Sequence, residues 1–439
     1  MRTKLNKILL FFLPFLLVGC TNNPTPTSSP SPTSEQKSPV VLIWWNLFDN
    51  QKDVQPLIDE YVKQNPNVTV QFISKKASVV QSGNFDQYVT QLDESIADPS
   101  QTPDIFPIYN TWAGKYENSV SKAPSSLVNE QYFEDYYAIT KKDFYRAGAG
   151  GAIALPQSMD AMAIIYNKDR LLTKGYTKPA YQWADFKTMA QQLTVKDGNG
   201  NVTAGGFSAG FYENVEFRFE MINLLMLVNR STMTDVNNTQ AIFYDPGQRT
   251  ETDSAVKFYK DLGSTAWSKT LKKDIVEFLE GRLAMYAAPS WRLIDIYNYN
   301  AQYKLNLNIG VAEVPQLSSY TTYWPSYWGY AVSKNSPKTE ESWKFIAFLN
   351  QKENLQLFNK TVKDNGRPIG IIYPRKSMNT ELAQDPILGP YVVSLSKADD
   401  WYMRDGKAMK KAFETFFADE KNIDLSGLQN TATSIIKGQ

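Results

Sequence analysis

The sequence contains no histidine and only one cysteine among its 439 residues. Without histidine, the chain lacks the usual general base of catalytic triads and the commonest zinc ligand. A single cysteine excludes an intrachain disulfide and zinc sites built from cysteines. An excess of one charge is also lacking, because 46 basic residues balance 45 acidic ones. We therefore expect no nucleic-acid partner, no metal site and no cofactor.

Aromatic residues, by contrast, are abundant: the chain has 10 Trp, 25 Tyr and 23 Phe. The composition is 42% hydrophobic and 21% charged, which is typical of a globular protein. It excludes a disordered chain, a collagen-like repeat and a coiled coil. The length is sufficient for two or three domains, each with its own buried core.

The N-terminus predicts a secretory signal peptide over residues 1–19. Basic residues precede an apolar stretch at 8–18, which is too short to cross a bilayer as a mature helix. The stretch ends in Leu-Val-Gly-Cys at 17–20, which resembles the lipobox of bacterial lipoproteins. This resemblance implies that Cys20 is lipidated and anchors the mature protein to the cell membrane, outside the cytoplasm.

Residues 20–39 are rich in Pro, Ser and Thr, and we interpret them, after the lipidated cysteine, as a flexible tether. The folded body then starts with an apolar run at 40–45, typical of a strand buried on both faces. Helical spacing of apolar residues follows at 54–62, and further strands are predicted at 68–73 and from 103. This alternation predicts parallel β-α-β units in an α/β fold.

The folded body also contains sequence motifs that occur together, in order, in one family of proteins. They are VLIWWNLFD at 41–49, PDIFPIYNTW at 103–112, ALPQSMDAMAIIYNKD at 154–169, WADFKTMAQQLTVKDGNGN at 183–201, FLEGRLAMYAAPSWRL at 278–293, WGYAVSKNSP at 328–337, WKFIAFL at 343–349 and NGRPIG at 365–370. Together they resemble the bacterial extracellular solute-binding proteins (family 1) of ABC importers, in the branch of maltose- and other sugar-binding lipoproteins.

The resemblance implies a two-lobed fold of the periplasmic-binding-protein type (type II), with about three hinge crossings and a ligand cleft between the lobes. It places lobe one at 40–157 plus 312–366, lobe two at 158–311 plus 367–439, and the crossings near Pro156, Pro315 and Gly366. In such α/β folds, ligands bind at the carboxyl ends of strands. We therefore expect the ligand-binding residues directly after the predicted strands.

The abundance of aromatic residues suits a carbohydrate ligand. Sugar rings stack their apolar faces on Trp and Tyr, and their hydroxyls bond to Asp, Asn and Arg. The resemblance implies ligand contacts at Asn46, Asp49, Tyr109, Asn110, Trp112, Asp160, Tyr212, Trp291, Arg292, Trp324, Trp328, Arg367 and Trp401. Among these, Trp291 and Trp401 are implied to stack on the sugar, and Asp160 to bind its hydroxyls. The loop around Trp324 is either an exposed binding patch or packing, whereas we expect Trp44, Trp183 and Trp343 in the core.

The implied function is delivery of a carbohydrate, by a monomeric binding protein, to the transmembrane subunits of an ABC permease. One alternative is a surface-anchored glycoside hydrolase with two carboxylates, and another is a binding protein for a polyol or glycerol phosphate. Residues 206–210 fit the G-x-S-x-G motif of serine hydrolases. That chemistry needs a base for the serine proton, and a chain without histidine lacks the usual one, so we expect no hydrolase site there. The order of the family motifs favours a binding protein and not an enzyme.

Overall fold

The computed structural model describes residues 38–82, 85–146, 150–317 and 320–439. The predicted signal peptide, Cys20 and nearly all of the predicted tether lie outside these residues, so they stay predictions. Within the described part of the chain, no helix is long and apolar enough to cross a membrane.

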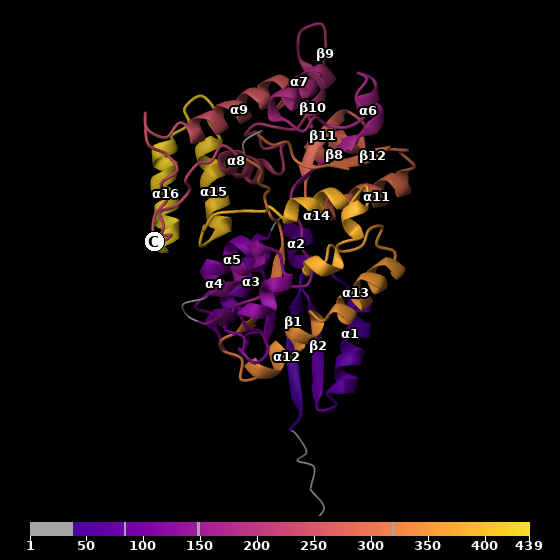
Figure 1. The fold of residues 1–439 in the computed structure, drawn as a ribbon, viewed down its shortest axis with the longest axis vertical. Helices are drawn as coiled ribbons and strands as arrows, with labels where there is room; N and C mark the ends of the chain where they lie inside the picture. The colour runs from indigo at the N-terminus through magenta and orange to yellow at the C-terminus, as the bar shows by residue number, and fades with distance from the viewer. Residues whose placement is uncertain (1–37, 83–84, 147–149, 318–319) are drawn as a thin grey trace, which may run out of the picture. The chain divides into compact units, whose positions relative to one another are not determined.

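The first of two main sheets is built mainly from the N-terminal part of the chain (Figure 1). Its order is β2 (Val68–Ser74), β1 (Val40–Asn46), β3 (Ile105–Tyr109), β13 (Trp328–Ser333) and β4 (Val120–Ser121), with β7 (Leu155–Pro156) also paired to β13. β1 runs parallel to β2 and to β3, which confirms the predicted β-α-β arrangement. β13 is antiparallel to β3 and returns from a distant part of the sequence, so local patterns did not reveal its neighbours.

Helices pack around this sheet and complete what we call the first lobe. They are α1 (Gln51–Gln64), α2 (Lys76–Ser82), α3 (Asp86–Ala97), α4 (Ala113–Tyr116), α5 (Ala138–Phe144), α12 (Thr339–Leu349) and α13 (Lys352–Asp364), with the short turns η1 (Asn110–Trp112) and η2 (Glu130–Asp135) and the two-stranded β5 (Tyr145–Arg146) and β6 (Gly151–Ala152). Trp44 lies at the centre of the core, with its ring edge-on to Tyr330 and Phe345. Trp44 and Trp343 are fully buried, as predicted.

The second main sheet has the order β12 (Ile309–Ala312), β8 (Ala163–Asn167), β11 (Leu283–Ala288), β10 (Val202–Phe207) and β9 (Val195–Lys196). The second lobe adds α6 (Lys168–Leu172), α7 (Trp183–Leu193), α8 (Arg218–Val228), α9 (Glu251–Ala266), α10 (Asp274–Leu279), α11 (Trp291–Tyr303), α14 (Gly389–Leu395), α15 (Gly406–Phe417) and α16 (Leu425–Lys437), with η4 (Leu382–Gln384). The turn η3 (Lys376–Met378) lies against the first lobe, where Ser377 bonds to Asp135. β8 and β11 are buried along their whole length. Trp183, at the start of α7, is buried as predicted.

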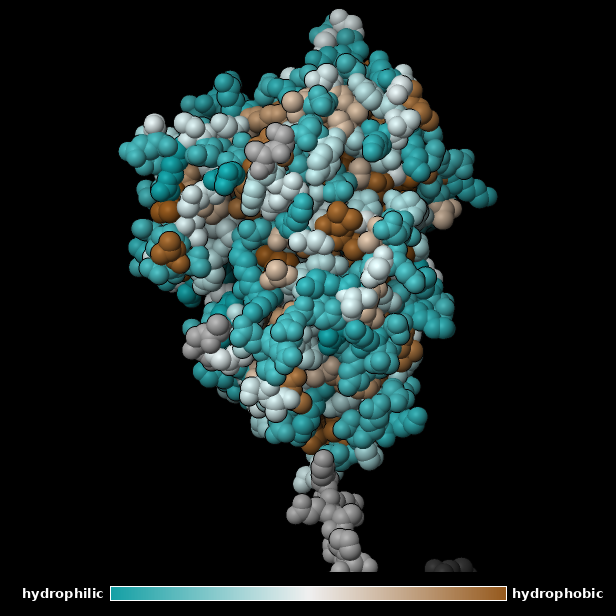
Figure 2. Space-filling view, in the orientation of Figure 1, coloured by the Kyte–Doolittle hydropathy of each residue, from teal (hydrophilic) through white to brown (hydrophobic). Residues whose placement is uncertain are grey.

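The chain passes between the two sheets at several points. It leaves the first sheet after β7 and enters the second at β8, and it returns between β12 and β13. After α13, which packs on α1, it reaches α14, which packs on β8. From Pro39 onward the described chain forms one compact unit. Polar side chains cover most of the face in Figure 2, and apolar ones form small separate patches.

The G-x-S-x-G segment at 206–210 is explained by close packing of the backbone. A Cβ atom at Gly206 would lie 1.8 Å from the carbonyl oxygen of Ala190 in α7. Gly210 has a φ of +90°, and a Cβ there would lie 3.2 Å from the Cα of Gly263 in α9. Ser208, between the two glycines, is 3% exposed. The glycines allow β10 and its loop to lie directly against two helices.

We therefore expect Gly206→Ala to lower the free energy of unfolding by about 1–3 kcal/mol, or more, because the clash is with backbone atoms that cannot rotate away. Urea unfolding measures this loss. The matched control is Gly198→Ala, since a Cβ there meets nothing within 4 Å. Equal stability of the two variants would show that α7 does not approach β10 this closely.

Candidate functional site

A cavity of about 1550 Å³ lies between the two lobes and is lined by residues of both. The first lobe contributes the loops after β1 and β3 and the start of β13, and the second lobe contributes the loop after β11 and the starts of α8 and α11. The carboxyl ends of strands are where α/β sheets usually bind ligands. The cavity exceeds the roughly 300–1,000 Å³ that is usual for small-molecule sites.

On the first-lobe side, aromatic side chains form one wall of the cavity. We call Phe48, Phe85, Tyr109, Trp112 and Trp328 the aromatic cluster; all five line the cavity. The ring of Trp328 lies at the centre of the cluster. Its centroid is 5.4 Å from that of Phe48, 4.8 Å from Phe85, 5.2 Å from Tyr109 and 4.9 Å from Trp112. Such edge-on and tilted contacts are the preferred geometry of aromatic packing. The cluster offers a broad apolar surface to a ligand.

On the second-lobe side, the main aromatic feature is Trp291 at the start of α11. Its side chain is 40% exposed and lies edge-on to Phe217 at 6.0 Å. The guanidinium of Arg292 lies 4.4 Å from the Trp291 ring centroid. Arg292 is itself held by ion pairs with Glu216 and, at 2.6 Å, with Asp295. Trp291 is therefore supported from behind while one side stays accessible to a ligand.

Asp160 lines the cavity, but its oxygens are bound within the protein. Oδ1 accepts bonds from the backbone N–H groups of Ala161 and Ser290, at 2.8 and 2.9 Å. Oδ2 accepts bonds from the Ser290 hydroxyl at 2.7 Å and the Trp291 N–H at 3.3 Å. The carboxylate thus satisfies N–H groups at the start of α11 that have no partner within the helix. Asp160 therefore holds the backbone at Ser290 and Trp291 while it lines the cavity, and its contact with ligand hydroxyls stays a prediction.

Burial raises the pKa of Asp160 to about 6, although the bonds from Ser290, Ala161 and Trp291 act in the opposite direction. Between about pH 4 and pH 6 the folded protein therefore holds a proton that the unfolded chain releases, and stability from this group falls as pH rises. The measured quantity is the difference in free energy of unfolding between wild type and Asp160→Asn. We expect this difference to decrease by up to about 3 kcal/mol as the pH rises across this range. Unfolding by urea at a series of pH values measures it. A difference that grows with pH would show that the donors outweigh burial.

Several buried polar atoms on the cavity wall have no hydrogen-bond partner among the described residues. They are Nε2 of Gln157, Oε2 of Glu220, and Nε of both Arg292 and Arg367. Gln157 is 5% exposed, and the other carboxylate oxygen of Glu220 bonds to Lys410 at 3.1 Å. A buried polar group without a partner is costly, so each of these atoms would gain from a bond to a ligand or to water.

The structure brings eight of the predicted ligand-binding residues together. Asp49, Tyr109, Trp112, Asp160, Trp291, Arg292, Trp328 and Arg367 all line the cavity. Sequence reasoning missed Phe48, Phe85, Gln157 and Glu220. A signal was present for Glu220, which is the one acidic residue of the mainly apolar helix α8, and for Gln157, which directly follows β7.

Two of the predicted tryptophans lie in the core, outside the described lining of the cavity. Trp401 is 4% exposed, and its Nε1 donates to Oδ1 of Asn223 at 2.7 Å. Trp324 is 1% exposed, and its ring packs edge-on against Phe219 at 6.4 Å. The interpretation of Trp324 as an exposed binding patch is therefore wrong. The motif did not reveal this because burial of both rings depends on helices α8 and α15 from other parts of the chain.

Three further predicted residues also lie outside that lining. Asn46 shapes the loop after β1, because its Oδ1 accepts bonds from the N–H groups of Phe48 and Asp49, both at 2.9 Å. The Asn110 amide is buried, and its Nδ2 donates to Asp400 at 2.9 Å. Tyr212 is half-buried and follows Gly210 in the loop after β10. The first two thus support the cavity from behind its wall.

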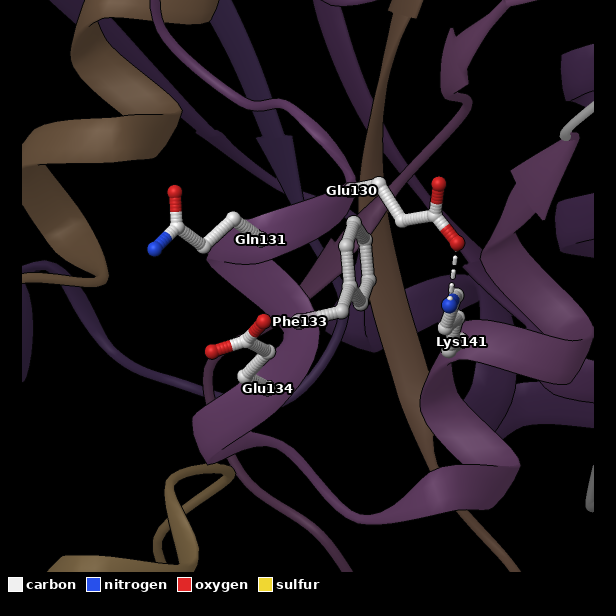
Figure 3. A pocket seen from close by; sticks show the side chains of 5 residues that line it. All are labelled: Glu130, Gln131, Phe133, Glu134 and Lys141. Atoms are coloured by element: carbon white, nitrogen blue, oxygen red, sulfur yellow. Dashed lines mark hydrogen bonds and ion pairs between the residues drawn. The ribbon is translucent and has the colours of Figure 1, made fainter.

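A second, smaller cavity of about 420 Å³ lies at the surface between η2 and α5 (Figure 3). It is lined by Glu130, Gln131, Phe133, Glu134 and Lys141. Glu130 and Lys141 form an ion pair at 2.6 Å, and the ring of Phe133 is buried beneath them. Among the described residues, no cluster of His, Cys, Asp and Glu side chains could hold a metal ion. The large cavity between the lobes is therefore the candidate functional site.

Comparison with known proteins supports this view of the fold. The chain resembles the cyclic alpha-maltosyl-1,6-maltose binding protein from Arthrobacter globiformis, with 16% identity and a TM-score of 0.71 over 92% of this chain and 100% of that one. It also resembles the sugar-binding protein MalE from Xanthomonas citri, with 16% identity and a TM-score of 0.69 over 91% of this chain and 98% of that one. A third similar structure is UgpB from Mycobacterium tuberculosis in complex with glycerophosphocholine, with 17% identity and a TM-score of 0.66 over 92% of this chain and 97% of that one.

These similarities confirm the predicted α/β, two-lobed fold of periplasmic binding proteins. The sequence itself matches the family model for bacterial extracellular solute-binding proteins over residues 48–356, which is well over half of the chain. That match includes most of the cavity wall, from Phe48 after β1 to Tyr330 in β13. The chain therefore belongs to the bacterial extracellular solute-binding protein family.

Proposed function

We propose that this protein binds a neutral carbohydrate in the cavity between its lobes and delivers it to an ABC importer outside the cytoplasm. The observation that carries the proposal is that the lining of this cavity combines aromatic surface with polar atoms that have no partner among the described residues. The aromatic cluster and Trp291 offer flat apolar surface from the two lobes. Gln157 offers an unpaired N–H donor and Glu220 an unpaired acceptor. A sugar hydroxyl both donates and accepts, so the hydroxyls of a sugar suit a group of either kind.

The charges of the cavity favour a neutral ligand. Its lining contains twelve acidic and ten basic side chains. Several pair with each other, including Lys115 with Asp93 at 2.7 Å and Arg218 with Glu414 at 3.0 Å. Binding of a phosphate group relies on cations that are free to form charge-assisted bonds, and among the described lining residues the Nε of Arg367 has no hydrogen-bond partner. Glycerol phosphate and related diesters are therefore the second candidate, supported by the fold shared with a relative in complex with glycerophosphocholine.

Three carboxylates of the cavity are bound within the protein in a way that does not suit a glycosidase. That reaction requires two carboxyl groups that flank the scissile bond and are free to act on it. Asp160 accepts bonds from α11, and Glu216 is paired with Arg292. Asp274 accepts N–H bonds from Glu216 at 2.9 Å and from Ile275 at 2.8 Å. These groups hold loops in place, which fits the binding role of the family.

A ligand screen tests the proposed function. Purified protein is heated with neutral mono- and oligosaccharides, polyols and glycerophosphodiesters, and hits are measured by calorimetry. A ligand that binds only the folded form raises the melting temperature, by an amount that grows with its concentration. We expect neutral saccharides to do so and to be recovered unchanged. A response to phosphodiesters alone would establish the second candidate, and new reaction products would establish an enzyme.

We further propose that the lobes close on the ligand and that the closed monomer docks on the transmembrane subunits of an ABC permease. Lobe one is taken as 40–157 plus 312–366, and lobe two as 158–311 plus 367–439. Contacts to both lobes at once, as in this cavity, favour the closed state. Small-angle scattering should show a smaller radius of gyration with bound ligand, and an unchanged radius at saturation would oppose closure.

Anchoring through Cys20 is part of the proposal and rests on the lipobox-like segment 17–20. We expect Cys20→Ser to move the protein from the membrane fraction to the soluble fraction, or to leave it unprocessed, because without lipid the polar tether that begins the mature chain offers the membrane no apolar group. Fractionation of cells that express each form measures this. A Cys20→Ser protein that is processed and sediments with membranes like wild type would contradict lipidation.

A further inference from the structure

Helix α11 carries a row of exposed side chains that begins in the cavity and leaves it. We call Trp291, Asp295, Tyr299 and Tyr303 the α11 ridge. Each member follows the last by four residues, so each lies about one turn, or about 6 Å, further along the helix, in a row that winds slowly around its axis. The side chain of Asp295 is 54% exposed, and Trp291, Tyr299 and Tyr303 are 40%, 41% and 54% exposed.

The ridge is continuous with the proposed ligand site. Trp291 and Asp295 line the cavity, as does Ile294 beside them. Tyr299 and Tyr303 are on the next turns of the same helix, and their ring centroids are 4.3 Å apart with an angle of 39° between the planes. The row therefore extends over about 18 Å from the cavity outward, which is longer than a single sugar ring.

The chemistry of the outer part of α11 matches that of the cavity wall. Between Asp295 and Lys304 the helix contains no charged residue. Its exposed residues there include Tyr299 and Tyr303, together with the amides of Asn298 and Gln302. Aromatic rings and amides are the groups that recognise the faces and hydroxyls of neutral sugars. Exposed aromatic rings that stay in water also carry a cost that a ligand would relieve.

We propose that the α11 ridge is an outer subsite, which binds the units of a neutral oligosaccharide that project beyond the cavity. The proposal rests on the proposed function and specifies it further: the ligand is a chain of sugars that runs out along α11. The large volume of the cavity, about 1550 Å³, is consistent with such a ligand.

The test compares ligands of increasing length. The probes are the linear maltooligosaccharides from maltose to maltoheptaose, measured by calorimetry on wild type and on the double variant Tyr299→Ala/Tyr303→Ala. We expect wild type to bind the longer chains more tightly, and the double variant to bind maltoheptaose about tenfold more weakly while its affinity for maltose is unchanged. The matched control is Tyr181→Ala, an equally exposed tyrosine that is neither on α11 nor in the cavity lining.

The outcomes separate the two proposals. If the double variant keeps the full gain in affinity with chain length, the ridge is not a sugar subsite and the proposal is overturned. An equal loss for maltose and maltoheptaose also overturns it, because the tyrosines would then act on the cavity itself. If wild type binds no member of the series, the proposed function fails for this class of sugar and the ridge proposal fails with it. Melting temperatures within experimental error of wild type show that each variant is folded.

Discussion

Trp291→Ala is expected to weaken ligand binding by about 2–4 kcal/mol, or about 30-fold to several hundred-fold, with little change in thermal stability. The indole is 40% exposed, belongs to the first residue of α11 and lines the cavity. Removing it takes away stacking surface for the sugar while few core contacts are lost. Because Asp160 and Arg292 hold the start of the helix through other atoms, we expect its backbone to stay in place.

Calorimetry and thermal unfolding on the same samples measure the two effects. Trp291→Phe keeps an aromatic face, so it should recover much of the lost affinity. Trp401→Phe is the matched control, since Trp401 is also a tryptophan singled out by the sequence but lies in the core. It should lower the melting temperature, through the lost bond to Asn223, and leave the ligand affinity almost unchanged. The reverse pattern would place the stacking residue at Trp401.

Trp328→Ala is expected to lower the free energy of unfolding by about 3 kcal/mol and also to weaken ligand binding strongly. Large-to-small changes of buried tryptophans cost about 3–5 kcal/mol, and the lower end applies because Trp328 is only partly buried. Its ring contacts every other member of the aromatic cluster. Its loss therefore removes the centre of the apolar wall as well as packing within the first lobe.

Urea unfolding and calorimetry measure these losses together. Trp328→Phe is the accompanying variant, because it keeps a ring at the centre of the cluster and remains testable if the alanine variant does not fold. It should show a smaller loss of both stability and affinity. Wild-type affinity in a destabilised Trp328→Ala protein would show that the cluster is part of the core and does not contact the ligand.

Local sequence patterns predicted the fold class because they reflect short-range geometry. The apolar run at 40–45 and the spacing at 54–62 correspond to β1 and α1, and β1 pairs in parallel with β2 and β3 as predicted. Residues at or just beyond the ends of strands, such as Tyr109 and Asp49, line the cavity. Their position follows from strand direction alone, since the carboxyl ends of parallel strands meet at one edge of a sheet.

Whether an aromatic residue faces ligand or core could not be predicted in the same way. Trp291 and Trp401 both occupy positions that resemble a stacking tryptophan, yet one is 40% and the other 4% exposed. Their difference arises from which distant helices cover them, and that information is not local in sequence. The partners of Gln157 and Glu220 are likewise decided by long-range packing, which leaves one polar atom of each unpaired.

By itself, then, the sequence determined the α/β class, the charge balance, the absence of histidine and the positions of the loops that follow the strands. It could not distinguish the glycines of residues 206–210 from a hydrolase motif until β10 was seen against α7 and α9. It placed Asp160 at the ligand site, and only the tertiary structure showed that its oxygens also bond to the start of α11. The physical reason is common to these cases: a residue's type sets the bonds it can form, and only packing between segments far apart in the chain decides which of them are formed.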